Sequence, residues 1–277
     1  MTEGSAHLHS YHLLFYMTVS STICVLCQSS LATQRQKAKA LARDLELSFA
    51  QAPEKKHNVH LVYTDNRLEL QYNPLLSTSK MRPVSVDLLY KGKIHPRLQS
   101  MSRKDPLARA VGIKSGKRPN VVDATAGLGT DGIALAWLGC KVTLIERSAI
   151  IHALLRDGLD RAGHHPSLQT IVKENISLYH GDSIEILQDL EISPHTVFLD
   201  PMYPRLKKER CRKKEMRIVR ETVGDDLNNE TLFTTALHVT AHRVVVKRPK
   251  RAEPLCLTPK SYHHITMKSG RFDVYLV

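Results

Sequence analysis

Residues 119–132 read Pro-Asn-Val-Val-Asp-Ala-Thr-Ala-Gly-Leu-Gly-Thr-Asp-Gly. A short apolar run that ends in a glycine-rich turn and leads into a helix is typical of the first strand, loop and helix of a doubly wound sheet. In such folds the loop binds a nucleotide-like cofactor where the strand ends. The stretch therefore predicts a Rossmann-like cofactor-binding domain.

The glycines of this loop are compatible with two classes of cofactor. Gly127, Gly129 and Gly132 satisfy the G-x-G-x-x-G pattern of dinucleotide-binding proteins. However, Asp131 would lie in the first turn of the following helix, where a dinucleotide places its negative pyrophosphate. Carboxylates at Asp123 and Asp131 favour a cationic ligand, and S-adenosylmethionine carries an ammonium and a sulfonium. We therefore predict S-adenosylmethionine, with a nicotinamide dinucleotide as the alternative.

Residues after the next two predicted strands can complete the cofactor site. Glu146 follows Gly129 by 17 residues, at a position where a carboxylate can accept hydrogen bonds from both ribose hydroxyls. Asp182 and Ser183 follow the third predicted strand and can reach the adenine. Ser183 is equally suited to cap the helix that follows.

A second motif, Asp200-Pro201-Met202-Tyr203, ends the fourth predicted strand. The Asp200 carboxylate and the Pro201 carbonyl can accept the N–H groups of an exocyclic base amine and direct its lone pair toward a methyl donor. Tyr203 can stack on the base. The alternative is a structural turn in which Asp200 is a cap and Tyr203 packs. We predict Asp200, Pro201 and Tyr203 as catalytic residues acting on a nucleobase.

From residue 121 onward, apolar segments alternate with helical patterns, which predicts a parallel sheet. A final pair of strands hinged at Ser269-Gly270 would be antiparallel. The prediction is an α/β, Rossmann-like class I methyltransferase fold over residues 119–277, with a seven-stranded, mostly parallel sheet. The predicted strands are 121–124, 141–145, 176–179, 196–199, 243–247, 263–268 and 271–277.

The segment before this domain predicts a small N-terminal α/β domain over residues 17–90. Residues 1–16 are expected to be a disordered extension. Residues 91–118 contain nine Lys or Arg and a single acid, Asp105, which predicts a basic connector. The elements expected in the small domain are a strand at 19–26, a helix at 31–49, and a hairpin at 59–63 and 67–71.

Composition restricts the class of partner. The 277 residues include 40 Lys or Arg and 27 Asp or Glu, a formal net charge of +13, which favours an anionic partner such as nucleic acid. Five cysteines at irregular spacing do not form a disulfide framework, so we expect a cytoplasmic protein. Cys24 and Cys27 form an isolated C-x-x-C, and we predict no metal site. Residues 11–27 are too short and hydroxyl-rich for a membrane span, so no membrane association is predicted.

A basic run follows the Asp200 motif directly. Residues 205–220 contain nine Lys or Arg and two Glu, and residues 207–222 have helical spacing. Such a run is often only a solvated helix face, but its position next to the predicted site favours contacts with RNA phosphates. The predicted RNA-binding residues are Lys207, Lys208, Arg210, Lys213, Lys214, Arg217, Lys247 and Arg248.

Several uncommon strings occur in the order found in one enzyme family. They are Asp-Ala-Thr-Ala-Gly-Leu-Gly-Thr-Asp at 123–131, Glu-Arg at 146–147, Leu-Asp-Pro-Met-Tyr-Pro at 199–204, Lys-Lys-Glu-Met-Arg at 213–217 and Val-Val-Val-Lys-Arg-Pro at 244–249. The chain from about residue 91 to 277 thereby resembles the ribosomal RNA small subunit methyltransferase J family. Those bacterial cytoplasmic enzymes use S-adenosylmethionine to methylate N2 of a guanosine in 16S ribosomal RNA.

The resemblance implies the same activity here, on 16S rRNA or the small ribosomal subunit. It implies cofactor contacts at Thr130, Asp131, Glu146, Arg147, Asp182, Ser183 and Asp200. Thr130 and Asp182 depart from the family pattern, which has an Arg and a small hydroxyl residue there. Residues 1–90 match only in general layout and carry no functional inference. The alternatives are adenine-N6 methylation and a non-catalytic role in rRNA binding or assembly, and the sequence leaves the oligomeric state open.

Overall fold

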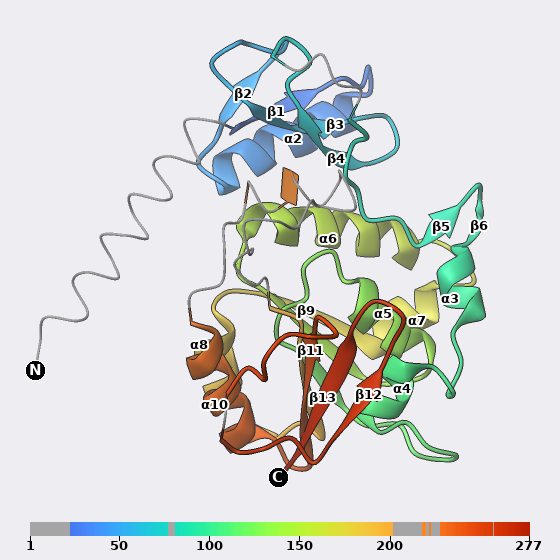
Figure 1. Cartoon of the computed structure of the whole chain (residues 1–277). Helices are drawn as coiled ribbons and strands as arrows, with labels where there is room; N and C mark the ends of the chain where they lie inside the picture. Colours follow the sequence, from blue (N-terminus) through green and yellow to red (C-terminus); the bar gives the residue numbers. More distant parts are fainter. Residues whose placement is uncertain (1–22, 77–80, 202–217, 220–221, 223–227, 257) are drawn as a thin grey trace, which may run out of the picture. The chain divides into compact units, whose positions relative to one another are not determined.

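The computed structural model describes residues 23–76, 81–201, 218–219, 222, 228–256 and 258–277 (Figure 1). The chain divides into two compact units. Unit 1 comprises Met1–Ser85 and Lys208–Gly224, and unit 2 comprises Val86–Lys207 and Asp225–Val277. In the described parts of both, no helix is long and apolar enough to cross a membrane.

Unit 1 contains a four-stranded sheet in the order β2-β1-β3-β4. β1 (Ile23–Cys27) is parallel to β2 (Ser48–Ala50) and to β3 (Val59–Tyr63), and β4 (Leu68–Tyr72) is antiparallel to β3. The predicted hairpin is thereby confirmed. Cys24 is fully buried and Cys27 only partly so, and both are free thiols. Their positions three apart on a strand place them on opposite faces of the sheet.

The helix predicted at 31–49 is shorter, and its last residues form a strand. α2 (Ala32–Asp44) ends before Glu46, which has a positive φ of 53°. The chain then enters β2, where Phe49 pairs with Val25 of β1. An apolar residue such as Phe49 fits the spacing of a helix and of a buried strand alike, and only the parallel partner strand distinguishes them.

The stretch expected to be a connector, 91–118, belongs to unit 2 and contains regular structure. It includes α3 (Pro96–Ser100) and α4 (Pro106–Val111), each with a proline in its first turn, and the hairpin of β5 (Leu89–Tyr90) and β6 (Lys93–Ile94). α4 packs on the edge of the large sheet with its apolar residues buried. The difference arises because the basic side chains lie on the exposed face of these short elements and dominate the composition.

Unit 2 contains a seven-stranded sheet in the order β12-β13-β11-β10-β7-β8-β9. The five strands β11, β10, β7, β8 and β9 are mutually parallel, whereas β13 is antiparallel to its neighbours β11 and β12. The predicted sheet is confirmed. Its strands are β7 (Val121–Asp123), β8 (Val142–Glu146), β9 (Ile176–His180), β10 (Thr196–Leu199), β11 (Arg243–Arg248), β12 (His263–Thr266) and β13 (Arg271–Leu276).

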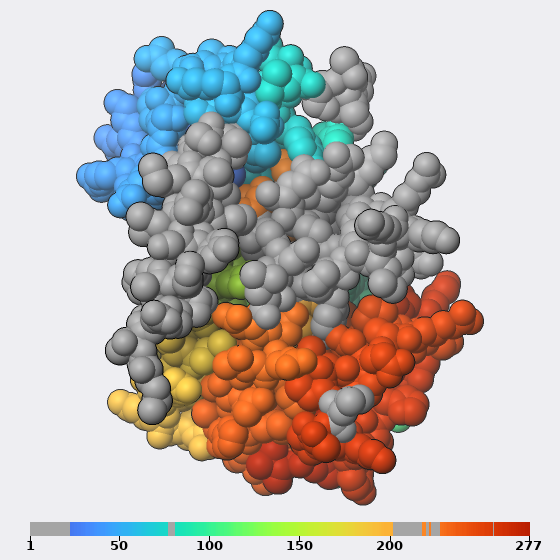
Figure 2. Space-filling model, turned by 60° about the vertical axis from the view of Figure 1, so that its left-hand side comes forward, coloured from blue at the N-terminus to red at the C-terminus, as the bar shows by residue number. Residues whose placement is uncertain are grey.

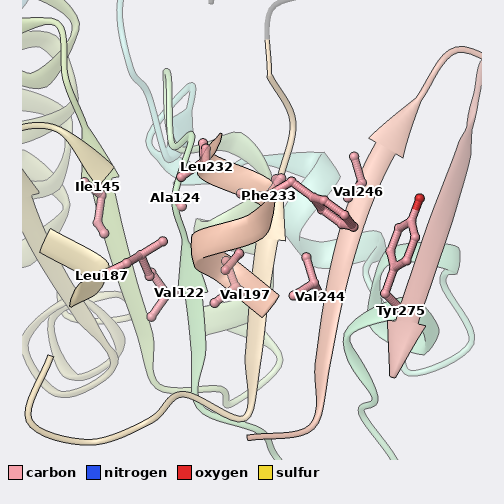
Figure 3. Packing of buried hydrophobic residues seen from close by; sticks show 12 residues of the cluster. Val122, Ala124, Ile145, Leu187, Val197, Leu232, Phe233, Val244, Val246 and Tyr275 are labelled. Atoms are coloured by element: carbon pink, nitrogen blue, oxygen red, sulfur yellow. The ribbon is translucent and has the colours of Figure 1, made fainter. Parts of the chain in front are cut away.

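Helices cover both faces of this sheet. On one face α8 (Ser183–Gln188) and α10 (Asn229–Val239) contribute Leu187, Leu232 and Phe233 to a core with the inward residues of β7, β10 and β11 (Figure 3). Figure 2 shows the outer surface of α8 and α10, coloured yellow to orange, as one closely packed layer. The other helices described between the parallel strands are α5 (Thr130–Trp137), α6 (Ala149–Gly163) and α7 (Gln169–Asn175).

The opposite face is covered by α5, which approaches the sheet closely. A Cβ atom on Gly132 of α5 would lie 2.3 Å from the Leu144 side chain of β8 and 3.1 Å from Asp123 Oδ2. This contact seats the helix that follows the glycine loop directly on the two central strands. The strand order reverses between β7 and β10, and in open α/β sheets ligands bind at the carboxyl ends of the strands at such a point.

Candidate active site at the carboxyl ends of the parallel strands

The loop between β7 and α5 has the backbone shape that its glycines allow. Gly127 and Gly129 have φ values of +54° and +73°, in the left-handed region that favours glycine. The Gly129 N–H donates to the Ala126 carbonyl at 2.8 Å, which closes a tight turn before the helix. The predicted strand, loop and helix are thus all present.

Glu146, the last residue of β8, holds this loop in place. Its side chain is buried; Oε2 accepts a hydrogen bond from Gly127 N at 2.8 Å and Oε1 accepts one from Ser148 N at 2.7 Å. A carboxylate offers about four lone-pair sites, so one group can hold the loop and also accept hydrogen bonds from a ligand. Glu146 therefore joins the glycine loop to the position predicted for the ribose.

Two carboxylates and two cations meet beside the loop. Lys247 Nζ, from β11, lies 2.6 Å from Asp131 Oδ2 and 2.7 Å from Asp200 Oδ2. Arg97 of α3 donates from Nη2 to Asp131 Oδ1 at 2.7 Å. The acids come from the first turn of α5 and the end of β10. Elements far apart in the sequence therefore form one charge-balanced cluster.

The cluster keeps the ammonium of Lys247 charged. Burial by itself would lower the pKa of Lys247, but the carboxylates of Asp200 and Asp131 outweigh that effect and raise the pKa above its usual value. We predicted that Lys247 contacts RNA phosphates, whereas the structure directs its side chain toward two acids. Arg248, the next residue, is partly buried and donates to the Glu253 carbonyl.

Asp123 lies beneath the loop and is almost completely buried, with 1% of its surface exposed. Its Oδ1 accepts a hydrogen bond from Thr125 N at 3.2 Å. Burial, together with the nearby charge of Asp131, raises the pKa of Asp123 to about 8. Asp123 is therefore largely protonated at neutral pH and supports the loop, which differs from the anionic cofactor contact that we predicted.

Asp182 and Ser183 have local roles that reverse one expectation. Asp182, not Ser183, caps α8, because its Oδ1 accepts a hydrogen bond from Ile184 N at 2.7 Å. Ser183 is buried, and its Oγ donates to the Ala124 carbonyl at 2.6 Å. Ser183 therefore fastens the start of α8 to the end of β7.

Asp200 and Pro201 lie next to the glycine loop, as the sequence predicted. The Asp200 N–H donates to Thr125 Oγ1 at 2.6 Å, and Pro201 is buried. The Asp200 side chain is 40% exposed, so a substrate can reach it. Thr130 opens α5 and Arg147 follows β8, and both are exposed. The predicted site residues Tyr203, Lys207, Lys208, Arg210, Lys213, Lys214 and Arg217 lie outside the described residues.

Sequence patterns did not indicate two residues of the site, Arg97 and Thr125. Arg97 was counted only as part of a basic connector, and Thr125 was not singled out. No local pattern marks either residue, because each acts on a partner from another element: Arg97 on Asp131 and Thr125 on Asp200. Within the described residues, no three His, Cys, Asp or Glu side chains are grouped as metal ligands.

Comparison with known proteins agrees with this arrangement. Residues 40–277 match a protein family described as "Putative SAM-dependent methyltransferase". The "Ribosomal RNA small subunit methyltransferase J" proteins of Desulfotalea psychrophila and Aeromonas hydrophila are 42% and 45% identical over 240 and 217 residues. These alignments cover 87% and 78% of this chain and 91% and 86% of the relatives.

The chain belongs to the ribosomal RNA small subunit methyltransferase J family. A crystal structure of a SAM-dependent methyltransferase from Neisseria gonorrhoeae, NGO1261, has the same fold, with a TM-score of 0.69 and 29% identity. The superposition covers 92% of this chain and 96% of that one. This member of the family is thus a SAM-dependent methyltransferase with a Rossmann-like class I fold.

The family relationship extends further than the sequence motifs indicated. The match begins at residue 40, within unit 1, whereas we expected similarity only from about residue 91. The chemistry of the site also fits S-adenosylmethionine. Glu146 carries a carboxylate at the end of β8, and Asp131 and Asp200 can interact with a cationic ligand. The Gly127 backbone faces open space, because a Cβ there would meet only the Thr125 carbonyl, 4.0 Å away.

Proposed function

We propose that this protein transfers a methyl group from S-adenosylmethionine to N2 of a guanosine in 16S rRNA of the small ribosomal subunit. The observation that carries the proposal is the position of Asp200-Pro201, hydrogen-bonded through Thr125 to the cofactor loop. The relatives' name, ribosomal RNA small subunit methyltransferase J, supports rRNA as the substrate. The net charge of +13 suits an RNA partner.

The cofactor, when bound, supplies a methyl group activated by a sulfonium. We assign the ribose hydroxyls to Glu146, which is already oriented by Gly127 N and Ser148 N. Asp131 and Asp200 would attract the positive charge, with Thr130 and Arg147 at the exposed margin and Asp182 and Ser183 toward the adenine. Asp123 would support the loop from below rather than contact the cofactor as an anion.

Asp200 and Pro201 would act on the amine of the base. The amine is a poor nucleophile because its lone pair is delocalised into the ring. Hydrogen bonds from its N–H groups to the Asp200 carboxylate and the Pro201 carbonyl would direct the lone pair toward the methyl carbon. The carboxylate would stabilise the positive charge that develops on the amine nitrogen, and the proton that the nitrogen loses would pass to solvent. Tyr203 would stack on the ring.

Lys247 would position Asp200 for this role. The ion pair at 2.7 Å fixes one carboxylate oxygen. The pairing also reduces the local negative charge, so the site is not simply an anionic cradle for a cation. The same side chain also contacts Asp131, so Lys247 would link the acid assigned to the cofactor with the acid assigned to the substrate.

The proposal is tested by product mapping. The purified chain is incubated with cofactor carrying a labelled methyl group and with small subunits that lack the modification. Nucleosides from the digested 16S rRNA are then separated, and label in N2-methylguanosine is the expected result. Label in N6-methyladenosine would contradict the base assignment. No label in rRNA with a folded, cofactor-binding chain would favour a non-catalytic RNA-binding role.

A matched variant shows that the label depends on the proposed site. Asp200→Asn preserves size and the backbone N–H that bonds Thr125, but removes the charge. We expect the methylation rate to fall at least about 100-fold, as for loss of a group that stabilises developing charge. The affinity for the cofactor should fall much less than the rate, because Asp131 remains, and the circular dichroism spectrum should not change. Asp189→Asn, at the C-terminal end of α8, serves as the charge-matched control.

A further inference from the structure

Near the start of unit 2, the hairpin of β5 and β6 leads into α3 (Figure 1). The Lys and Arg side chains of this segment are exposed. β5 and β6 pair through a two-residue turn in which Lys91 and Gly92 have φ values of 51° and 72°. Positive φ at both positions is the signature of a tight hairpin turn. Residues 88–104 contain no Asp or Glu, and their Lys and Arg residues are Lys91, Lys93, Arg97, Arg103 and Lys104.

An exposed aromatic ring lies among these cations. Tyr90 is 54% exposed. Lys91 Nζ lies 5.5 Å from the centroid of its ring, and the His95 ring approaches it edge-on at 6.3 Å. A large ring held by polar neighbours, and not covered by the core, is suited to contact a flat partner.

The hairpin is connected to the active site through α3. Arg97 of α3 bonds Asp131 at 2.7 Å, and its backbone N–H donates to His95 Nδ1 at 3.2 Å. Lys93 precedes Arg97 by four residues, so their Cα atoms are at most about 14 Å apart. The hairpin and the cofactor loop therefore belong to the same compact unit, and the short chain between Lys93 and Arg97 limits how far apart they can lie.

We propose that Tyr90, Lys91, Lys93 and His95, here named the Tyr90 platform, bind an unpaired nucleotide of the substrate RNA near the nucleotide to be methylated. The inference rests on the proposed function and deepens it. Unpaired bases in RNA are commonly recognised by stacking on aromatic side chains, while Lys side chains contact the flanking phosphates. Stacking accepts any base, so the platform would contribute affinity and register rather than base identity.

RNA explains the arrangement better than an acidic protein would. An acidic peptide would use the lysines but has no need of a flat ring beside them. A nucleotide offers both a planar surface and negative charge at a spacing set by its sugar. Because Arg97 is committed to Asp131, the platform's charge toward RNA comes mainly from Lys91 and Lys93.

The test measures binding of the full chain to unmethylated 16S rRNA fragments that contain the nucleotide to be methylated. S-adenosylhomocysteine is present so that no reaction occurs. The variants are Tyr90→Ala and the double variant Lys91→Ala/Lys93→Ala. The control is Lys114→Ala/Lys117→Ala, which removes two exposed lysines from the turn before β7, at the opposite ends of the strands. Circular dichroism and S-adenosylhomocysteine affinity verify that each variant is folded.

We expect Lys91→Ala/Lys93→Ala to weaken RNA binding about 10-fold. The slope of log Kd against log salt concentration should fall by roughly 1.4, since each single-strand phosphate contact contributes about 0.7. Tyr90→Ala should weaken binding by about 10-fold with the slope unchanged, because stacking is not a charge effect. Lys114→Ala/Lys117→Ala should behave like the wild type.

The outcomes separate this inference from the proposed function. The platform is overturned if Lys91→Ala/Lys93→Ala binds RNA as well as Lys114→Ala/Lys117→Ala does. If the wild type also forms N2-methylguanosine, the proposed function still holds. Selective loss of RNA binding in Lys91→Ala/Lys93→Ala, together with no methylated guanosine from the wild type, supports the platform and contradicts the proposed function.

Discussion

Lys247 Nζ lies 2.7 Å from Asp200 Oδ2, although the two residues are 47 positions apart in the sequence. They meet because they lie at the carboxyl ends of the neighbouring parallel strands β11 and β10. The ammonium also bonds Asp131, so it joins the predicted substrate-binding acid to the first turn of the helix after the glycine loop. The sequence indicated a group of acids at this site, and the structure shows that a cation from the same sheet balances part of their negative charge.

Replacing Lys247 should slow methyl transfer without weakening cofactor binding. Lys247→Met removes the ion pair that orients Asp200, and we expect kcat to fall about 10- to 100-fold, or ~1.4–2.7 kcal/mol. The Kd for S-adenosylmethionine, measured by calorimetry, should not rise, because a positive charge near a cationic ligand has been removed. Lys247→Arg should recover part of kcat. Lys250→Met, an exposed neighbour, is the control, and an unchanged kcat in a folded Lys247→Met would contradict the positioning role.

The raised pKa of Asp123 should make unit 2 less stable as pH rises. Because the pKa is about 8 in the folded state and 3.8 ordinarily, the folded state binds more protons than the unfolded state between about pH 4 and pH 8. The free energy of unfolding should fall through that window and level off above it. Asp123→Asn, which cannot ionise, should remove this dependence.

Trp137 provides the measurement for this prediction. It lies in α5 of unit 2 and is the only tryptophan of the chain, so its fluorescence reports denaturant unfolding of that unit. Between pH 6 and pH 8.5 the wild type should lose roughly 2–3 kcal/mol more than Asp123→Asn. Parallel pH profiles for the two proteins would show that Asp123 is already ionised at pH 6.

Gly132 should tolerate no side chain. A Cβ at this position would lie 2.3 Å from Leu144 in the sheet, so Gly132→Ala must displace α5 and the loop before it. We expect a loss of about 1–3 kcal/mol in unfolding free energy, with weaker cofactor binding. The matched control is Gly163→Ala at the end of α6, where the nearest atom would be 3.7 Å away. That variant should be neutral or up to about 1 kcal/mol more stable, and equal losses in both variants would refute the close-packing explanation.

Glu146→Gln should loosen the glycine loop and weaken the cofactor. The carboxylate accepts from Gly127 N and Ser148 N with different oxygens, whereas an amide presents one oxygen and one NH2 group. One backbone N–H would then face a donor, and the ribose contact would lose its charge. We expect the Kd for S-adenosylhomocysteine to rise about 10- to 100-fold in calorimetry. Glu185→Gln, exposed in α8, should leave the Kd unchanged.

The N-terminal sheet and the elements of 91–118 show where local patterns were insufficient. Phe49 fitted a helical spacing, but pairing with Val25 placed it in a strand. The basic residues of 91–118 suggested a connector, although Leu107 and Val111 of α4 are buried. In both cases tertiary contacts decided the structure, because propensity and composition are weak compared with burial against a specific partner.

The amino-acid sequence by itself determined the strand–loop–helix at Val121–Trp137, the seven-stranded sheet and the acids at the strand ends. These follow from local alternation of apolar segments and from the rule that parallel strands share one edge for their carboxyl ends. Only the tertiary structure decided the charge and partners of those residues. The pKa of Asp123 is raised because the side chain is buried, and Lys247 contacts Asp200 because β10 and β11 are neighbours. Burial and distance between separate strands set a side chain's pKa, and neither is encoded in local sequence.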